Sequence, residues 1–540
     1  MNAVDWGIVT LYLSGMLLLA AWLGRSQRAS KDYFLAGNAM GPGALAASTI
    51  ATQCSTNSLL GAPAFVGFTL GGGLVWLQYE LAVPLAMAAL LFLVVPARRS
   101  GITSIYAILE SRLGTASRRT ASASFLLFRG VATGVTIYGI ALVLALIMDL
   151  SFAWAVALLM GVTLVYDLLG GLRAVVVSDV LQLALLAVTV LIALVLLAGT
   201  VPLSDWFNAR TDTLVNDWGT TGNNYGFWPM LIGGFFLYAA YYGCDQSQTQ
   251  RLLAARSAGD TARVLVLNGV LRFPLVLAYC LLGLALAAYA ATDPGFIAHL
   301  PRTDTGNPNF NLVFPSYVLA NFAPGFVGLV MVGLIAAAMS SIDSAINSLS
   351  AATVEDFIAP FTDLSPAQSL FVSRLTTLLW GLATVLFSFQ VERIAPTILE
   401  AINKVGSMAN GPLLALFCCA LWFPKLGQRA ALLGFAAGLG ANLCAALALP
   451  QLSWLWWNVL GWAVALTVAG LFGRALPAPA TGASTGDGDA DANMIAATPA
   501  SSDAYTPARR RRDLIVLTSM ALLIMLICVI FDRLSGGGGA

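Results

Sequence analysis

The sequence predicts an all-α, polytopic membrane protein with about fourteen transmembrane helices. Of its 540 residues, 59% are hydrophobic and only 10% are charged, whereas soluble domains carry roughly 25% charged residues. A helix needs about 20 apolar residues to cross a bilayer. Fourteen segments meet this requirement: 5–24, 44–70, 74–96, 121–148, 152–170, 175–200, 228–255, 262–291, 315–351, 370–389, 394–424, 428–448, 452–473 and 514–531.

The loop charges orient these helices. The first apolar segment, 5–24, has no basic start and no small-residue cleavage site, so we expect a retained helix and not a signal peptide. With the N-terminus outside, nineteen of the 27 Lys and Arg residues, Arg251 among them, fall on the cytoplasmic side and four on the external side. Because cytoplasmic loops carry an excess of positive charge, this bias predicts an outside N-terminus. We expect the protein in a plasma membrane, here a bacterial inner membrane.

The remaining composition argues against several classes of protein. A near-zero net charge argues against a nucleic-acid partner. The single histidine, His299, and seven cysteines without a CxxC pair argue against a catalytic or zinc site. We therefore expect neither an enzyme nor an organic cofactor. A primary pump would need a phosphate-binding loop, and a channel would need a filter such as TVGYG; the sequence carries neither.

Two apolar segments five helices apart are interrupted. The segment 44–70 contains the small and polar run TQCSTNS, followed by Gly61 and Pro63, and the segment 228–255 contains Gly243 and a polar run from Asp245. A pair of broken helices at equivalent places in two halves indicates an inverted-repeat transporter with a binding site near the middle of the membrane. The alternative is two kinked helices with small-residue packing faces.

Ionisable residues inside the helices indicate a polar pathway. They are Glu80, Asp179, Asp245, Asp343, Arg129, Arg272 and Lys404. Their charges sum to −1, which one bound cation or one proton would neutralise. Ser340, Ser341, Asp343 and Ser344 follow one another in the segment 315–351, and hydroxyl and carbonyl oxygens are the ligands that a hard cation such as sodium prefers. These hydroxyls can instead bond back to their own helix.

Several motifs in this order resemble the sodium:solute symporter family, which includes glucose, sialic acid, proline and monocarboxylate carriers. They are DYFLAG at 32–37, YE at 79–80, GITSIYAILESRLG at 101–114, GGLRAVVVSDVLQ at 170–182, DQSQTQR at 245–251 and AAAMSSIDSAINS at 336–348. The resemblance covers residues 5–475 and implies a LeuT-type 5+5 inverted repeat.

The resemblance also divides the chain. It implies an extra N-terminal helix and cytoplasmic loop (1–43), a first repeat (44–200), a second repeat (228–424) and two extra helices (428–473). Residues 475–512 are rich in Ala, Gly, Ser, Asp and Pro and are expected to be a flexible cytoplasmic linker. A last helix and tail would occupy 513–540. We expect the protein to function as a monomer in the lipid bilayer.

The resemblance further implies one or two co-transported sodium ions. The main sodium site would take backbone carbonyls of Ala51, Cys54 and Ala337 and the hydroxyls of Ser340 and Ser341. Asp179, with Ser340 and Ser344 opposite, would serve this sodium or a second one. The chain departs from the family at Asp343, where members with a second sodium site often have a hydroxyl, and we expect Asp343 to strengthen a second cation site or to carry a proton. Asp179 and Asp343 are expected to meet in the cytoplasmic half of the membrane.

The substrate positions implied by the resemblance are Gln53, Ser58, Tyr79, Glu80, Arg129, Asp245, Gln248, Arg272 and Asn403. The missing aromatic at 248 argues against the stacking of a sugar. Arg129 resembles the arginine with which sialic acid carriers hold a carboxylate, and a guanidinium matches a carboxylate bidentately. We therefore favour a carboxylate-bearing solute, either a sugar acid such as sialic acid or a monocarboxylate. Alternatives are a neutral-sugar symporter with Arg129 paired to Asp245 or Glu80, and a transporter-like sensor or channel.

Overall fold

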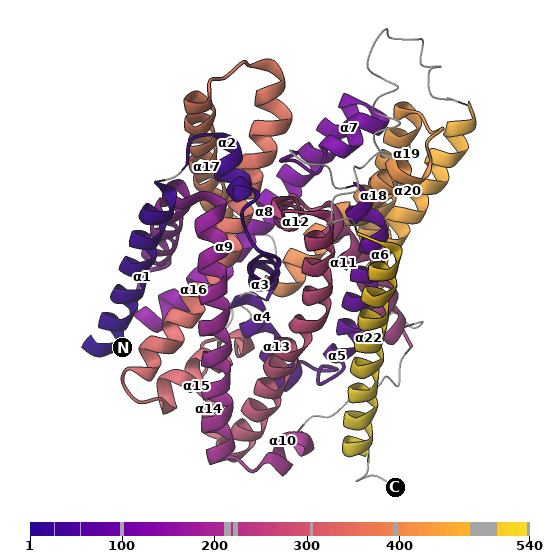
Figure 1. The fold of residues 1–540 in the computed structure, drawn as a ribbon. Helices are drawn as coiled ribbons and strands as arrows, with labels where there is room; N and C mark the ends of the chain where they lie inside the picture. The colour runs from indigo at the N-terminus through magenta and orange to yellow at the C-terminus, as the bar shows by residue number, and fades with distance from the viewer. Residues whose placement is uncertain are drawn as a thin grey trace.

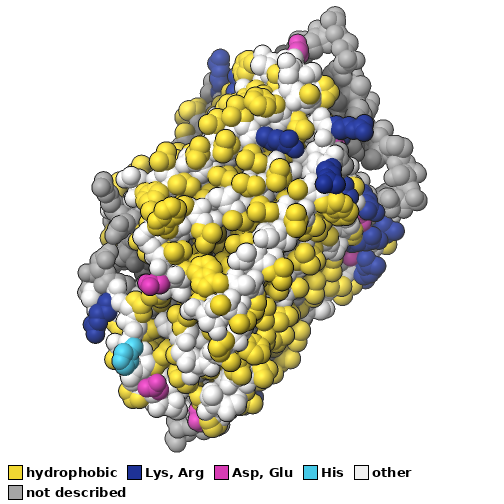
Figure 2. Space-filling model, turned by 90° about the vertical axis from the view of Figure 1, so that its left-hand side faces the viewer, with side chains coloured by type: hydrophobic (Ala, Val, Ile, Leu, Met, Phe, Trp, Pro, Cys, Tyr) yellow, Lys and Arg dark blue, Asp and Glu magenta, His cyan; other side chains and the backbone are white. Residues whose placement is uncertain are grey.

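The computed structural model describes all residues except 26, 55, 98–101, 210–217, 220–224, 303–305, 392–397, 476–504 and 537–540, and it leaves the side chains of 97, 209, 398–403, 475 and 534–536 undescribed. The described chain is built from helices, and eleven of them are long and apolar enough to cross a membrane. Figure 1 shows these helices packed into one bundle. Figure 2 shows a broad hydrophobic face with its charged side chains mostly toward the edges, as expected of a surface that faces lipid.

The first part of the chain contains the first predicted break. Its helices are α1 (Ala3–Gly24), α2 (Ser30–Leu35), α3 (Pro42–Gln53), α4 (Thr56–Phe68), α5 (Trp76–Glu80), α6 (Ala82–Ala97), α7 (Ala107–Leu113), α8 (Thr115–Met148), α9 (Phe152–Thr200) and α10 (Leu203–Ala209). The α-helical backbone stops between α3 and α4, where Cys54 has φ −82° and ψ 57°. The interruption predicted from the polar run in 44–70 is therefore confirmed.

The element α9 holds two predicted segments, 152–170 and 175–200. They are joined at Gly171, whose φ of 53° and ψ of −163° interrupt the helical path. Glycine adopts such a backbone without strain, and a Cβ at this position would lie 2.7 Å from a ring carbon of Tyr33. The second half of α9 carries Asp179, which hydrogen-bonds to Ser48 on α3 and to Ser340 on α16.

The second part of the chain contains the other break. Its helices are α11 (Gly234–Cys244), α12 (Gln246–Ala254), α13 (Ala258–Thr292), α14 (Pro294–Ala298), α15 (Val313–Asn321), α16 (Phe326–Thr353), α17 (Pro366–Ser388), α18 (Ile398–Trp422), α19 (Gln428–Ala448), α20 (Leu455–Ala475) and α22 (Pro507–Gly536), with a short π-helix, η2 (Pro229–Gly233), before α11. Asp245, in an extended conformation, separates α11 from α12. The second predicted interruption is therefore also confirmed.

Two predicted boundaries differ from the structure. The segment 315–351 is not one helix, because it is divided into α15 and α16 at Pro324 and Gly325, and Gly325 has a positive φ of 89°. The last helix begins at Pro507, within the predicted linker 475–512, so the basic run 509–512 is helical. Most of that linker lies outside the described residues. The other boundaries of the predicted repeats stay predictions.

The broken helices lie in the middle of the packing. The first half-helix, α3, packs on α9 and α13, while α16 packs on α9, α8 and α3. On the other side, α11 packs between α6 and α18, and α22 packs on α6 and α13. Figure 1 shows α22 along the outer side of the bundle, away from α1.

Candidate cation and substrate sites

A cavity of about 190 Å³ lies where the two broken helices meet α8 and α18. Polar and charged side chains supply much of its wall. Those that were predicted from the sequence as substrate positions and line it are Gln53, Ser58, Tyr79, Arg129, Asp245 and Arg272. Thr52 and Ser341 also line it, so the cavity reaches the region predicted to bind sodium.

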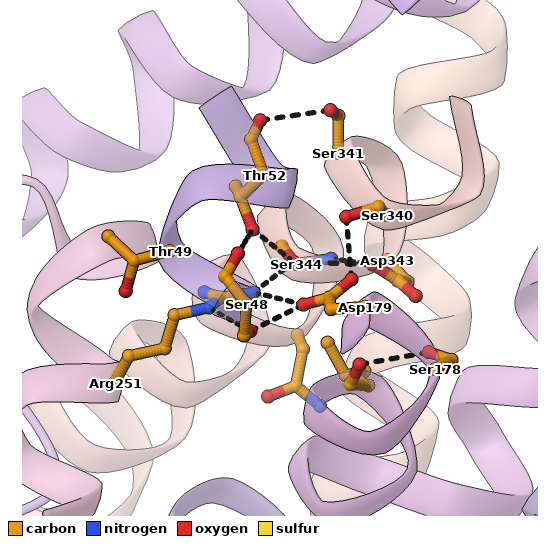
Figure 3. Close-up of polar contacts among 12 residues, drawn as sticks. Ser48, Thr49, Thr52, Ser178, Asp179, Arg251, Ser340, Ser341, Asp343 and Ser344 are labelled. Carbon is orange, nitrogen blue, oxygen red and sulfur yellow. Dashed lines mark hydrogen bonds and ion pairs between the residues drawn. The ribbon is translucent and has the colours of Figure 1, made fainter. Parts of the chain in front are cut away.

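Ser341 joins the end of α3 to α16. Its hydroxyl donates to the backbone carbonyl of Thr52 at 2.9 Å and lies 3.5 Å from the carbonyl of Ala337 on its own helix. Figure 3 shows this contact directly above the cluster around Asp179. The structure therefore brings the predicted hydroxyl ligand to the C-terminal end of α3, where helix carbonyls have no partner within the helix.

The other predicted main-site positions lie around this contact. Ala51 lies in the last turn of α3 and is buried. The carbonyl of Cys54 accepts a hydrogen bond from the Tyr279 hydroxyl at 3.2 Å. Ser340 points elsewhere, because its hydroxyl donates to Asp179 at 2.5 Å. The carbonyl of Thr52 was not predicted as a ligand, although this residue stands in the polar run that predicts the break.

Asp179 is the centre of a buried polar cluster. Its carboxylate accepts hydrogen bonds from Ser340 on α16 and Ser48 on α3. Arg251 on α12 pairs with the same carboxylate, with 3.2 Å between Nη2 and Oδ2. The cluster therefore unites α3, α9, α12 and α16. Figure 3 shows the side chains of Ser48, Ser340 and Arg251 around Asp179.

Arg251 was not predicted to lie in this cluster. The loop-charge count placed it on the cytoplasmic side of the membrane, but the structure buries its side chain to 1% exposure. Its guanidinium also donates to Ser48 Oγ at 2.6 Å and to Ser344 Oγ. The sequence contains one clue, since Arg251 closes the polar motif DQSQTQR without an apolar spacer.

Asp343 lies next to this cluster. Its Oδ1 accepts from the backbone N–H of Ser344 at 2.5 Å and lies 3.3 Å from the Ser344 hydroxyl. That hydroxyl in turn contacts Thr52 Oγ1 at 3.1 Å. Within the described part of the chain, the buried Oδ2 of Asp343 has no hydrogen-bond partner. This oxygen is therefore available for a cation or a proton.

A third buried carboxylate, Asp167, was also missed. It lies in α9 before the kink and accepts from Asn347 Nδ2 at 3.0 Å, while its Oδ2 has no partner among the described residues. Asp167, Asp179, Asp343 and Arg251 are all at most 1% exposed. If all four are ionised, three carboxylates against one guanidinium leave two negative charges. Since charges inside a membrane protein are costly unless they are paired, the region favours the uptake of positive charge.

The charged side chains of the cavity form two pairs. Arg272 donates through Nη2 to Glu80 at 3.0 Å and to the Tyr238 hydroxyl at 2.8 Å. Arg129 lies 3.8 Å from Asp245, which is too long for a hydrogen bond. The first pair is therefore tightly held, and the second is loose.

Three predicted substrate positions do not lie among the described lining residues. Glu80 is buried behind the wall and holds Arg272. Gln248 is also buried, and its Nε2 donates to the hydroxyl of Tyr241, which does line the cavity. The side chain of Asn403 lies outside the described residues.

Two discontinuous helices at a polar cavity inside a multi-helix bundle define a secondary transporter. The chain belongs to the sodium:solute symporter family, because the model of that family matches residues 33–438. It is therefore a multi-pass membrane transporter that couples the movement of a small solute to sodium. The resemblance inferred from the motifs is confirmed.

Individual relatives agree with this assignment. The sodium-coupled monocarboxylate transporter 1 of Mus musculus is 31% identical over 461 residues, which cover 82% of this chain and 73% of that protein. The sodium/sialic acid symporter SiaT of Proteus mirabilis is 25% identical over 499 residues, which cover 91% and 98%. The substrate-bound, outward-open structure of a Na⁺-coupled sialic acid symporter matches with a TM-score of 0.79 at 22% identity and covers 88% of this chain and 99% of that one. This likeness confirms the predicted fold class.

Proposed function

We propose that the protein uses sodium entry to take up a small solute that bears a carboxylate, by alternating access. The observation that carries this proposal is the loose Arg129–Asp245 pair, 3.8 Å apart in the cavity wall. The Nε of Arg129 is buried and has no partner among the described residues. A solute carboxylate can therefore take two N–H groups of this guanidinium in a bidentate pair without breaking a short hydrogen bond to Asp245.

The two relatives support a carboxylate, since one is named for monocarboxylates and the other for sialic acid. A neutral sugar is the second candidate, because Tyr79 and Arg272 line the cavity and Glu80, paired with Arg272, lies directly behind them. We favour the carboxylate because Gln248, where sugar-carrying members have an aromatic gate, is buried away from the cavity.

The main sodium site is proposed at the carbonyls of Ala51, Cys54 and Ala337 and the hydroxyls of Ser340 and Ser341. Its support is the contact of Ser341 with the end of α3, which puts hydroxyl and carbonyl oxygens from two helices side by side. The second cation, either sodium or a proton, is proposed at Asp179, Asp343 and Ser344. Its support is the unpartnered Oδ2 of Asp343 within the described chain and the excess of negative charge around it.

The functional test compares wild type with two arginine variants of α8. Thermal unfolding is measured with sodium or choline, across N-acetylneuraminate, short monocarboxylates, hexoses and amino acids, because a ligand that binds the folded state raises its stability. We expect sodium-dependent stabilisation by a carboxylate and its loss in Arg129→Gln. Arg119→Gln is the matched control, since Arg119 stacks on Phe361 and does not line the cavity.

Uptake into proteoliposomes then separates the classes of function. A symporter accumulates the stabilising solute only when a sodium gradient is imposed, whereas a sensor binds without uptake and a channel only equilibrates. Stabilisation by hexoses alone, unaffected by Arg129→Gln, would replace the carboxylate with the neutral sugar. Uptake that is indifferent to sodium would contradict the proposed coupling.

The orientation and the assembly state complete the proposal. We place the N-terminus outside, in a bacterial inner membrane, and the working unit as a monomer. An epitope added before Met1 should be accessible to antibody on intact spheroplasts, and labelling only after lysis would reverse the orientation.

A further inference from the structure

We infer that Arg251 is a tethered cation that competes with the transported cation for the oxygens of Asp179, Ser48 and Ser344. This inference rests on the proposed sodium coupling and concerns the second cation site. The guanidinium lies inside the oxygen cluster, so in this arrangement it satisfies the carboxylate that an entering cation would need.

The contacts of Arg251 come from all sides of the cluster. Nε donates to Ser48 Oγ on α3 at 2.6 Å, and Nη2 reaches both Asp179 on α9, at 3.2 Å, and Ser344 on α16. Nη1 returns to its own helix at the carbonyl of Ser247, at 2.5 Å. Figure 3 shows the side chain extended toward this set of oxygens. Three of the four contacts thus go to groups that would be ligands of a small cation.

The charge balance makes the two cations alternatives. Asp179, Asp167 and Asp343 are buried together with Arg251 as the positive partner of Asp179. Ser344 and the carboxylate of Asp179 cannot point their lone pairs at a guanidinium and at a sodium ion in the same place. A sodium ion bound by Asp179, Asp343 and Ser344 must therefore displace Nη2 from Asp179 and Ser344. The Oδ2 of Asp343, which has no hydrogen-bond partner among the described groups, supplies further negative charge to that ion.

The position of Arg251 in the fold links this exchange to helix movement. It sits on α12, the half-helix that follows the break at Asp245. Without the contacts of Arg251, α12 loses its side-chain bonds to Ser48 and Asp179, although Gln250 still bonds to Asn347 at 2.9 Å. Cation entry therefore removes the side-chain bonds that hold α12 to Ser48 on α3 and to Asp179 on α9.

The experiment is a sodium titration of thermal stability, in choline-balanced salt, with wild type, Arg251→Gln and Arg263→Gln. If the arginine occupies the oxygens about nine-tenths of the time, its removal should lower the half-saturating sodium concentration roughly tenfold. Arg263, exposed and paired with Asp260 on α13, is the matched loss of one arginine charge and should leave the titration unchanged. An unchanged or higher half-saturating concentration in Arg251→Gln overturns the inference.

A second readout distinguishes competition from structural support. Guanidinium ion at a non-denaturing concentration should raise the half-saturating sodium concentration of Arg251→Gln and leave that of wild type unchanged. If guanidinium ion leaves Arg251→Gln unchanged as well, the result contradicts the inference. If Arg251→Gln does not fold, Arg251→Lys carries the test. Lysine keeps the charge but lacks the planar guanidinium that reaches both Ser48 and Ser344, so the half-saturating sodium concentration should still fall. If it does not fall, the inference is overturned. A wild type that does not respond to sodium would instead refute the proposed coupling.

Discussion

Replacement of Ser341 by alanine tests the main cation site. The Ser341 hydroxyl donates to the Thr52 carbonyl at 2.9 Å, across the interface of α3 and α16. The variant removes one proposed sodium ligand and leaves a buried carbonyl without its donor, which costs roughly 1–3 kcal/mol. A loss of about 1–3 kcal/mol in the free energy of sodium binding would raise the half-saturating sodium concentration roughly 5- to 150-fold.

A matched control exists on the same helix. Ser348 is also buried, but among the described residues its hydroxyl bonds back to α16, to the carbonyls of Ser344 and Ala345, both at 2.8 Å. Ser348→Ala should therefore change the sodium requirement little. The assay is initial uptake into proteoliposomes at increasing external sodium, with thermal unfolding as a check that both variants are folded. Equal sodium curves for Ser341→Ala and Ser348→Ala would refute the placement of the ion between α3 and α16.

Three further predictions concern the charged residues Arg118, Glu110 and Asp343. Arg118 forms ion pairs with Glu110, at 2.5 Å, and with the buried Asp356, at 2.6 Å. Because Arg118→Gln leaves the buried carboxylate of Asp356 without its positive partner, it should lower the free energy of unfolding by about 3 kcal/mol. Thermal or denaturant unfolding measures this change. Burial opposes the ionisation of Glu110, but hydrogen bonds from Arg118 and Thr115 outweigh it and hold the pKa of Glu110 below its usual value. The stability that Glu110 contributes is therefore present at neutral pH and lost as the pH falls below the usual glutamate range of about 4.3; Glu110→Gln should flatten this part of the stability profile. Asp343→Asn should change the sodium or the pH dependence of uptake, and wild-type dependence on both would remove Asp343 from the cation site.

Local features of the sequence were enough to predict most of the helices and both helix breaks. Long apolar runs predict the helices, and the polar run 52–58 predicts the first break, which the structure places at Cys54. Gly61 and Pro63 lie inside α4 and do not form the break. The division of 315–351 into α15 and α16 was missed, although Pro324 and Gly325 mark it, because the flanking apolar residues make the segment long enough for one continuous helix.

The sequence did not predict which charged residues pair in the buried cluster. Arg251 and Asp179 are separated by 72 positions, and nothing in the local pattern around either one names the other. Asp167 was overlooked for a different reason. It stands near the end of a predicted apolar segment, where a charged residue normally faces water. Only the packing of α9, α12 and α16 shows that these residues share one buried volume, and hence that a basic residue counted on the cytoplasmic side lies inside the helix bundle.

The proposed carboxylate gives the second cation a thermodynamic role. One sodium ion and one carboxylate cross as a neutral pair, so the membrane potential contributes nothing to their accumulation. A second cation at Asp343 makes the cycle carry one net charge, for which a potential of 100 mV supplies about 2.3 kcal/mol, or roughly fifty-fold accumulation. Uptake of the carboxylate driven by a potassium diffusion potential, inside negative, at equal sodium on both sides should therefore be present in wild type and lost in Asp343→Asn. The same potential dependence in both proteins would show that the second charge is carried elsewhere, with Asp179 as the next carboxylate to be replaced.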